Sequence, residues 1–452
     1  MFKMKTITLS LLALLLVMSF ASCASDTTSD LPLPSKDMKA YLQVKVTVEG
    51  SGDTRASRAT TEPQGGEDGN GREPGINKEN DVNSLTVLLY KSDKDKKDLS
   101  EADATIDYVY TFTNLNKVTT SSGSDATYTT VPREIDASIV DKNYHVIVIA
   151  NADDMTSRCK GKKISEVRDL QMSKVCTRDA DITNFSNFIM SSKTDAMIDF
   201  TKEGSETNPY QVTVDIERLA ARIDIIPNAT YDGTSQGYYY NVMDGTNVVG
   251  GFKLESVTPS KVLTKGEYLI KRVSSDAAVS AVTYFGLEEM DATTKASTNY
   301  VVCPWTKDRT GLTLAEAEGP TSLYNVKETT STSTTDPSYI LDYVMENTTT
   351  DNKEDNSTGL IFKGKYYESS EWDATKHRPI AGAKGTEKDY TYTIRHSDPN
   401  GTGPSTAPMY YGIVRNNIYQ IKIEGVVGKT KGLKLTIHVR KWATYTHDET
   451  TM

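Results

Sequence analysis

Leu42-Gln43-Val44-Lys45-Val46-Thr47-Val48 and Leu433-Lys434-Leu435-Thr436-Ile437-His438-Val439 are the two stretches that decide the fold, and they have the same pattern. In each stretch, four aliphatic side chains alternate with three polar ones. Successive side chains of a strand point to opposite faces, so a period of two puts all the aliphatic side chains on one face. Both stretches are therefore predicted to be β-strands with one face suited to a core.

Similar short strands recur along the rest of the chain, while only residues 164–172 carry a helical pattern. The sequence has 25 Tyr against 9 Phe and 3 Trp, and aromatic and β-branched residues suit half-buried pleated surfaces. Many short strands with almost no helix predict an all-β protein built of sandwich domains. The further predicted strands are 85–89, 106–112, 146–150, 212–216, 252–257, 300–303, 339–345, 360–367, 390–394 and 418–423.

The length of 452 residues allows two or three domains, and we place one boundary after Pro227. This gives an N-terminal β-sandwich domain at residues 82–227 and a C-terminal one at 228–425. Residues 426–452 contain the last strand, which the stretch from Gly425 to Gly432 is expected to join flexibly to the domain before it.

The region between the first strand and the first domain is poor in side chains that could form a core. Residues 50–81 contain Gly, Pro, Thr and charged residues, with Ile76 as the only large aliphatic residue. Such a segment cannot offset its ordering entropy, and exposed flexible loops are where proteases cut. We therefore expect residues 23–55 to form a tether with the first strand and residues 56–81 to form an exposed, protease-sensitive loop.

The N-terminus has the features of a secretory signal. Lys3 and Lys5 precede an apolar run over residues 7–20, which small residues and Cys23 follow. A basic start, a short apolar core and small residues before a cut site define such a signal. A Cys directly after the small residues indicates a bacterial lipoprotein signal at residues 1–22, with a lipid on the thiol of Cys23. No other run approaches the ~20 apolar residues that a transmembrane helix requires.

Charge and motifs exclude several classes of function. The net charge of −10 and the pI of about 5.2 argue against a nucleic-acid partner, which favours a basic face. None of the five histidines has the spacing of paired metal ligands, and no GxSxG or phosphate-binding motif is present. We therefore expect no catalytic residue, metal or cofactor. Whether Cys159 and Cys176 form a disulfide stays open at this point.

The equal length and parity of the two terminal strands suggest that one can replace the other. If a protease cuts in the loop, the first strand is held only by non-covalent contacts, and its loss leaves a groove with unpaired edges. A neighbouring copy could fill that groove with its last strand, which is donor-strand complementation. A head-to-tail contact of this kind, which does not close on itself, builds a filament. The displaced side chains would be Leu42, Val44, Val46 and Val48, and the donor side chains Leu433, Leu435, Ile437 and Val439. The alternative is that both are ordinary sandwich strands.

Several short motifs, in order along nearly the whole chain, resemble the fimbrillins of Bacteroidia, the subunits of protease-assembled (type V) pili. The resemblance is strongest to the shaft subunit of the minor fimbrium. The matching motifs are Phe20–Cys23, Thr54–Ala56, Tyr144–Asn151, Glu217–Asp224, Tyr343–Thr348, Phe362–Tyr366, Tyr411–Asn417 and Trp442.

The resemblance implies two tandem transthyretin-like β-sandwich domains and export as a lipoprotein to the outer membrane, then to a surface fimbrium. It also implies removal of the first strand by an Arg- or Lys-directed protease, after Arg55 or Arg58, each followed by Ala. The implied partners are copies of the chain itself, accessory tip and anchor subunits, the protease, and host protein or glycan, with roles in adhesion and biofilm formation. A fimbrial anchor, a tip adhesin and a monomeric glycan-binding lipoprotein remain as alternatives.

Overall fold

The computed structural model describes residues 39–443 with internal gaps, of which the longest are 49–71, 92–103, 270–313, 316–337 and 401–410. All described residues belong to one compact unit. They form two ten-stranded sheets with a few short helices, so the all-β prediction is confirmed. The predicted strand at residues 300–303 lies outside the described residues.

The first sheet is built from residues 40–218, and its main path runs β4-β3-β8-β12-β14-β1-β6-β5. The strand β8 is buried along seven of its eight residues, which explains why its sequence is a continuous apolar run. The strands of this sheet are β1 (Ala40–Val48), β3 (Leu85–Tyr90), β4 (Ile106–Phe112), β5 (Leu115–Val118), β6 (Thr127–Thr130), β7 (Arg133–Ile135), β8 (Asn143–Ala150), β12 (Met190–Ser192), β13 (Ala196–Asp199) and β14 (Tyr210–Arg218).

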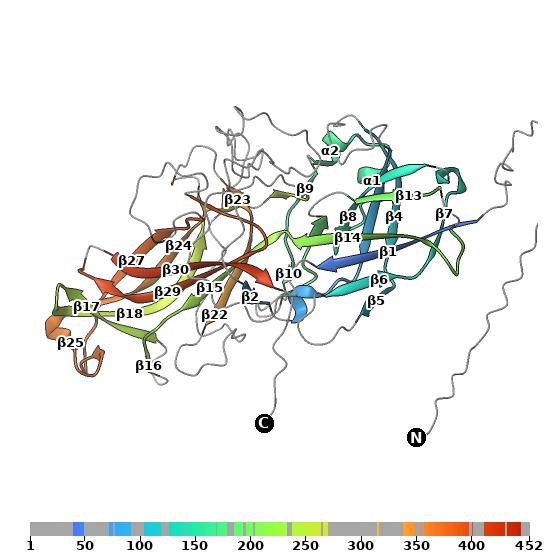
Figure 1. Cartoon of the computed structure of the whole chain (residues 1–452). Helices are drawn as coiled ribbons and strands as arrows, with labels where there is room; N and C mark the ends of the chain where they lie inside the picture. Colours follow the sequence, from blue (N-terminus) through green and yellow to red (C-terminus); the bar gives the residue numbers. More distant parts are fainter. Residues whose placement is uncertain are drawn as a thin grey trace, which may run out of the picture. The chain divides into compact units, whose positions relative to one another are not determined.

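The second sheet follows the path β2-β30-β29-β17-β18-β24-β27, with β15, β16 and β22 paired to it off this path. Figure 1 shows its strands gathered apart from those of the first sheet. They are β2 (Arg72–Pro74), β15 (Ala220–Ile226), β16 (Thr230–Asp232), β17 (Gly237–Asp244), β18 (Asn247–Ser260), β22 (Tyr339–Met345), β24 (Gly359–Glu368), β27 (Thr386–Thr393), β29 (Asn417–Val427) and β30 (Gly432–Ala443).

The place where the chain changes sheet differs from the predicted boundary after Pro227. The strand β15 pairs with β22 and β29 of the second sheet, and only Leu219 separates it from β14 of the first. The apolar run of β15 looks like a continuation of β14 in the sequence, because both strands are fully buried where they meet.

Each sheet contains a parallel pair formed by strands far apart in the sequence. In the first sheet, β1 pairs parallel with β14, the last strand of that sheet. In the second sheet, β15 pairs parallel with β29. The strand β30 follows this second pair and joins the opposite edge of β29 as an antiparallel hairpin. In the second pair, β29 is the later strand, as β14 is in the first pair. The strand β30 therefore comes after the parallel pair of its sheet, and among the described residues the first sheet has no strand in that place.

The remaining elements are short. The helices are α1 (Thr156–Cys159) and α2 (Ile164–Arg168), with 3₁₀ turns η1 (Asn77–Asn80), η2 (Ala137–Ile139) and η4 (Ser369–Glu371). The predicted helix at residues 164–172 therefore ends early, at Arg168. Two-stranded pairs are β10 (Thr177–Arg178) with β11 (Phe185–Ser186), β20 (Gly266–Glu267) with β9 (Gln171–Met172), β19 (Val262–Leu263) with β21 (Leu314–Ala315), β23 (Asn347–Thr348) with β28 (Gly412–Ile413), and β25 (Trp372–Asp373) with β26 (Arg378–Pro379).

The predicted loop at residues 56–81 ends earlier than expected. Residues 72–74 form β2, which pairs parallel with β30, and residues 77–80 form η1. Glu79 is fully buried and Asn80 is 3% exposed. The segment from Arg72 onward is therefore part of the fold, although its composition is that of a loop. Arg55 and Arg58 lie outside the described residues.

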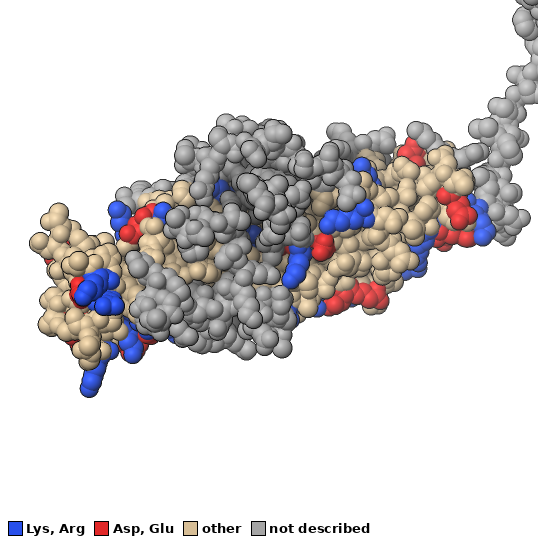
Figure 2. Space-filling view, turned by 90° about the horizontal axis from the view of Figure 1, so that it is seen from below, with Lys and Arg blue, Asp and Glu red and all other residues tan. Residues whose placement is uncertain are grey.

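Charged side chains of both signs lie close together on the face shown in Figure 2, over the described residues. The described part of this face therefore shows no large single-signed patch that would attract a polyanion.

Candidate assembly site

The first strand, β1, lies inside the first sheet and not at its edge. It pairs parallel with β14 from Leu42 to Val48 and antiparallel with β6 and β7 on its other side. In Figure 1 it runs as a blue arrow between β14 and β6. The side chains of Leu42, Val44, Val46 and Val48 are all 0% exposed. If β1 left, it would open a groove with four apolar pockets between two unpaired strand edges.

Polar contacts fix the register of β1 in this groove. The backbone N–H of Val44 donates to Oγ1 of Thr130 at 3.0 Å, and Nε2 of Gln43 donates to the carbonyl of Thr130 at 3.0 Å. On the other side, Nε2 of Gln211 donates to Oε1 of Gln43 at 3.1 Å. These bonds bind the polar face of β1 to both neighbouring strands.

The last strand, β30, is less deeply buried than β1. Ile437 is 2% exposed and Val439 is fully buried, whereas Leu433 and Leu435 are only partly buried against the second core. The predicted flexible join from Gly425 to Gly432 is partly strand, because Gly425–Val427 belong to β29 and Val427 pairs with Gly432 of β30. The donor stretch is thus an integral strand with a loosely packed first half.

Two contacts among the described residues cover parts of the outer edge of β30. The strand β2 pairs with residues 441–443. The side-chain amide of Asn400 pairs with the backbone of Ile437: its Nδ2 donates to the carbonyl at 2.6 Å, and its Oδ1 accepts from the N–H at 2.7 Å. Asn400 therefore acts as a one-residue substitute for a neighbouring strand.

The far end of β30 is held by a buried cluster around Glu79. We call Glu79, Arg218, Arg222, Tyr343 and Trp442 the junction cluster; all five side chains are 0% exposed. The Glu79 carboxylate accepts hydrogen bonds from Nη1 of Arg222 at 3.1 Å, from Nε1 of Trp442 at 2.8 Å, and from the Tyr343 hydroxyl. One carboxylate thus connects η1, β15, β22 and β30.

The two arginines of the cluster enclose the indole of Trp442. The guanidinium carbons of Arg218 and Arg222 lie 4.8 and 5.5 Å from the indole centroid, which is within cation–π range. Arg218, at the end of β14, donates from Nε to the Glu79 carbonyl at 2.9 Å. The cluster therefore joins the first sheet to the second and to the C-terminal strand.

The charges of the junction cluster are balanced by one further residue. Asp224 accepts two hydrogen bonds from Arg222, each at 2.9 Å, so the two carboxylates and the two guanidiniums cancel. Burial lowers the pKa of Arg222, but the charges of Asp224 and Glu79 outweigh burial and raise that pKa above its usual range. Burial, together with the charge of Glu79, raises the pKa of Tyr343 well above its ordinary value. Arg222 stays cationic and Tyr343 stays a neutral donor.

Sequence reasoning missed Glu79 because a lone carboxylate in a polar segment gives no signal of burial. It did select the motif from Glu217 to Asp224 and Trp442, but only as marks of a family. Their physical role, as the two arginines and the indole of one cluster, appears only when the sheets are assembled.

The predicted cysteines form no disulfide or reactive site in the described part of the chain. Cys23 lies outside the described residues. Cys159 and Cys176 are buried free thiols, so they do not pair with each other. Burial raises the pKa of Cys159 to about 11 and that of Cys176 to about 12, which leaves little reactive thiolate at neutral pH.

Over the described residues, no group of three or more His, Cys, Asp or Glu could hold a metal ion. None of the helices in this part of the chain is long and apolar enough to cross a membrane.

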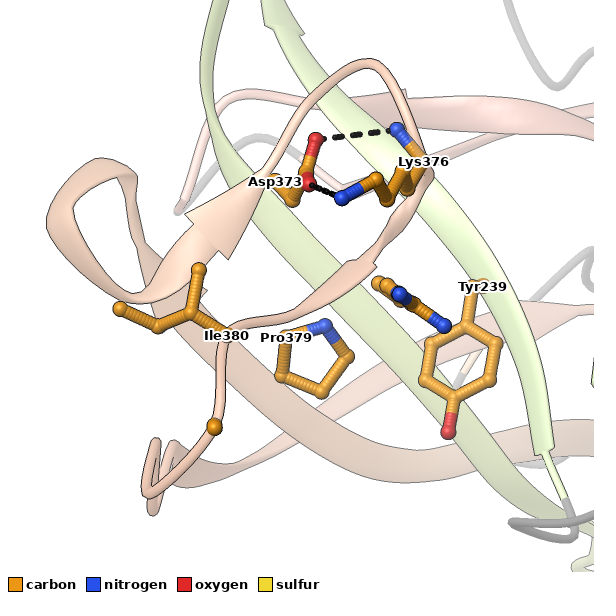
Figure 3. A pocket seen from close by; sticks show the side chains of 7 residues that line it. Tyr239, Asp373, Lys376, Pro379 and Ile380 are labelled. Atoms are coloured by element: carbon orange, nitrogen blue, oxygen red, sulfur yellow. Dashed lines mark hydrogen bonds and ion pairs between the residues drawn. The ribbon is translucent and has the colours of Figure 1, made fainter.

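A surface pocket of about 480 Å³ lies at the β25–β26 hairpin, where Tyr239, Asp373, Lys376, Pro379 and Ile380 surround it (Figure 3). Tyr239 is only 4% exposed, so its ring offers no open face on which a sugar could stack. The Lys376 ammonium is held by Asp373 at 3.3 Å. These contacts favour a packed hairpin over a glycan site.

Comparison with known proteins gives a family. Residues 40–248 match the family model described as major fimbrial subunit protein (FimA). No curated protein matches the sequence significantly.

The chain is also similar to solved structures of fimbrial proteins. A fimbrilin (FimA) of Porphyromonas gingivalis W83 is 15% identical, with a TM-score of 0.39, over 90% of this chain and 98% of that one. The tip fimbrial protein Mfa3 of Porphyromonas gingivalis is 13% identical, with a TM-score of 0.39, over 89% of this chain and 100% of that one. A fimbrial assembly protein of Parabacteroides distasonis ATCC 8503 is 11% identical, with a TM-score of 0.37, over 88% of this chain and 95% of that one.

The family match supports a structural role in a cell-surface fimbrium over an enzymatic role. The match of residues 40–248 to the model of the major fimbrial subunit protein (FimA) confirms the fimbrillin resemblance inferred from the sequence.

Proposed function

We propose that this chain is a shaft subunit of a surface fimbrium that polymerises by donor-strand exchange. It is exported as a lipoprotein through Cys23 and cut after Arg55 or Arg58 by an Arg- or Lys-directed protease. The strand β30 of one copy then replaces β1 of the next. Tip and anchor subunits complete the fibre, which serves adhesion and biofilm formation.

The observation that carries this proposal is the burial of β1 together with its connection to the chain. Four fully buried aliphatic side chains stabilise β1 in the sheet by roughly 6–12 kcal/mol, at ~1.5–3 kcal/mol each, before ordering costs. Residues 49–71, which include both Arg55 and Arg58, lie between β1 and β2. A cut there removes the covalent link, so that β1 can leave, and the vacated site then favours an equivalent strand.

The position of β30 supports its role as the donor. It follows the β15–β29 pair, so its departure leaves that parallel pair intact. Leu433 and Leu435 are partly exposed in their own subunit and would gain burial in the groove. The contacts of Trp442 in the junction cluster must break first, so the junction cluster opposes premature release.

The cleavage step is tested by replacing Arg55 and Arg58 together with Ala and examining the cell surface by electron microscopy and SDS-resistant laddering. We expect an intact monomer and no filaments, because β1 stays linked to its sheet. The matched control is a chain in which Ala replaces Lys91 and Lys94, two basic residues that follow β3 in the sequence. This variant should still form filaments. Filaments of normal length from the Arg55/Arg58 variant would exclude cleavage at these residues as the trigger.

A further inference from the structure

We propose that β30 enters the vacated groove in the same direction as β1, with Leu433 at the Leu42 position and Val439 at the Val48 position. This inference rests on the proposed donor-strand function and adds the donor's register, its direction and two residue neighbours across the subunit joint. The partner is a second copy of this chain.

The alternation of buried positions restricts the register. In β1 the inward positions are 40, 42, 44, 46 and 48, and the residues between them are partly or fully exposed. A shift of one residue turns the polar face of the donor into the core, so only even shifts remain. Three of these require comparison: no shift, two residues forward and two residues back.

A shift by two in either direction buries a lysine. Moving the donor one way places Lys431 at the Leu42 position, and moving it the other way places Lys441 at the Val48 position. Leu42 and Val48 are both 0% exposed, and an unpaired ammonium is very costly in such a site. Without a shift, all four pockets receive aliphatic side chains.

The size of the side chains fixes the direction. In the direction of β1, Leu433 replaces Leu42 and Val439 replaces Val48, so the two end pockets keep their volumes. In the reverse direction Val439 would underfill the Leu42 pocket and Leu433 would overfill the Val48 pocket. Both underfilling and overfilling destabilise a close-packed core.

The start of the donor also favours this direction. Lys431 would fall at the position of Ala40, the first residue of β1. Gly432 precedes the donor residues and has φ +125° in its own subunit, so the chain can turn away before Lys431 enters the groove. In reverse, Arg440 and Lys441 would occupy this entrance, and no glycine lies between them and the donor.

The register places two donor residues beside exposed side chains of β14. Gln43 is paired with Gln211, and Thr47 is paired with Asp215. Lys434 takes the Gln43 position and so lies beside Gln211, and His438 takes the Thr47 position and lies beside Asp215. A reversed donor exchanges these two neighbours.

The test is a cysteine scan across the subunit joint. Asp215→Cys is combined in turn with Lys434→Cys, Thr436→Cys, His438→Cys or Arg440→Cys, and Gln211→Cys is combined with Lys434→Cys or His438→Cys. Protease-cut, polymerised chains are oxidised, and the intersubunit disulfides are quantified on denaturing gels as the bands that a reductant removes. We expect about tenfold more cross-linking for 215–438 and 211–434 than for the other pairs, because a disulfide needs Cα atoms within about 7 Å.

The unsubstituted chain distinguishes failure of the proposed direction or register from failure of strand exchange itself. It reports background from native thiols, of which Cys159 and Cys176 are buried. If SDS-resistant ladders form and cross-linking is greatest at 215–434 or 211–438, the proposed direction is wrong. If cross-linking is greatest at 215–436 or 215–440, the proposed register is wrong. Either result is still consistent with strand exchange. Absence of ladders from the unsubstituted, cut chain would overturn the proposed function itself.

Discussion

At the scale of single residues, Glu79 makes several buried contacts although its place in the sequence gives no signal of burial. Its carboxylate accepts from Arg222, Trp442 and Tyr343 inside the fold, where water cannot replace a lost partner. A charge pair buried in this way contributes little net stability compared with an apolar core, but removal of one partner leaves an uncompensated charge.

We therefore expect Glu79→Ala to lower the free energy of unfolding by about 3–5 kcal/mol, because the cluster then holds two guanidiniums but only the carboxylate of Asp224, which binds Arg222. Urea denaturation followed by fluorescence of the tryptophans measures this loss. Glu134→Ala is the matched control, since Glu134 pairs with Lys39 on the exposed surface. An equal effect of the two substitutions would contradict the role assigned to Glu79.

At the scale of elements, β30 is a strand with two kinds of contact. Its first half packs loosely through Leu433 and Leu435, while Val439 and Trp442 are fully buried. This division separates folding from assembly, because a substitution in the first half disturbs the subunit less than it disturbs the filled groove. Ile437 is unsuitable for this purpose, since at 2% exposure it belongs to the core of its own subunit.

Leu435→Asp is expected to leave a folded monomer and to abolish filaments. In the subunit the new carboxylate reaches water, but in the groove it would occupy the site of Val44, which is 0% exposed, at a cost of several kcal/mol. Circular dichroism and electron microscopy measure the two properties separately. Lys434→Asp, on the exposed face of the same strand, is the control and should still polymerise. Normal filaments from Leu435→Asp would exclude β30 as the donor.

At the scale of the whole molecule, two strands differ from the rest. A cut between β1 and β2 can separate β1 from the chain, and β30 comes after the β15–β29 pair of the second sheet. Because β1 is internal, its loss affects both β14 on one side and β6 and β7 on the other. A cut subunit that has lost β1 therefore gains stability from any strand that refills the groove. The subunit's own β1 and the β30 of a neighbouring copy compete for this one site.

A synthetic peptide with the sequence of residues 39–49 should therefore inhibit polymerisation of cut chains in proportion to its concentration. The loss of SDS-resistant ladders measures the inhibition. The same peptide with Val46→Asp should not inhibit, because it places a carboxylate in an apolar pocket. If both peptides act equally, the groove is not the site of competition.

The sequence alone predicts elements whose pattern is local. Alternation identified β1 and β30, and the continuous apolar run identified β8, because burial of one or both faces leaves a direct mark on side-chain choice. The change of sheet at Leu219 leaves no such mark: the end of β14 and all of β15 are buried, so local pattern cannot separate the two sheets there, and the domain boundary after Pro227 stays a prediction.

What the sequence determined by itself is the all-β class, the matching parity of the two terminal strands and the resemblance to fimbrillins. What only the tertiary structure decided is that β1 lies inside its sheet, that β30 follows the β15–β29 pair, and that Glu79 lies buried between two arginines and the indole of Trp442. The physical reason is that strand neighbours and buried ion pairs depend on residues hundreds of positions apart, as the 363 positions between Glu79 and Trp442 illustrate.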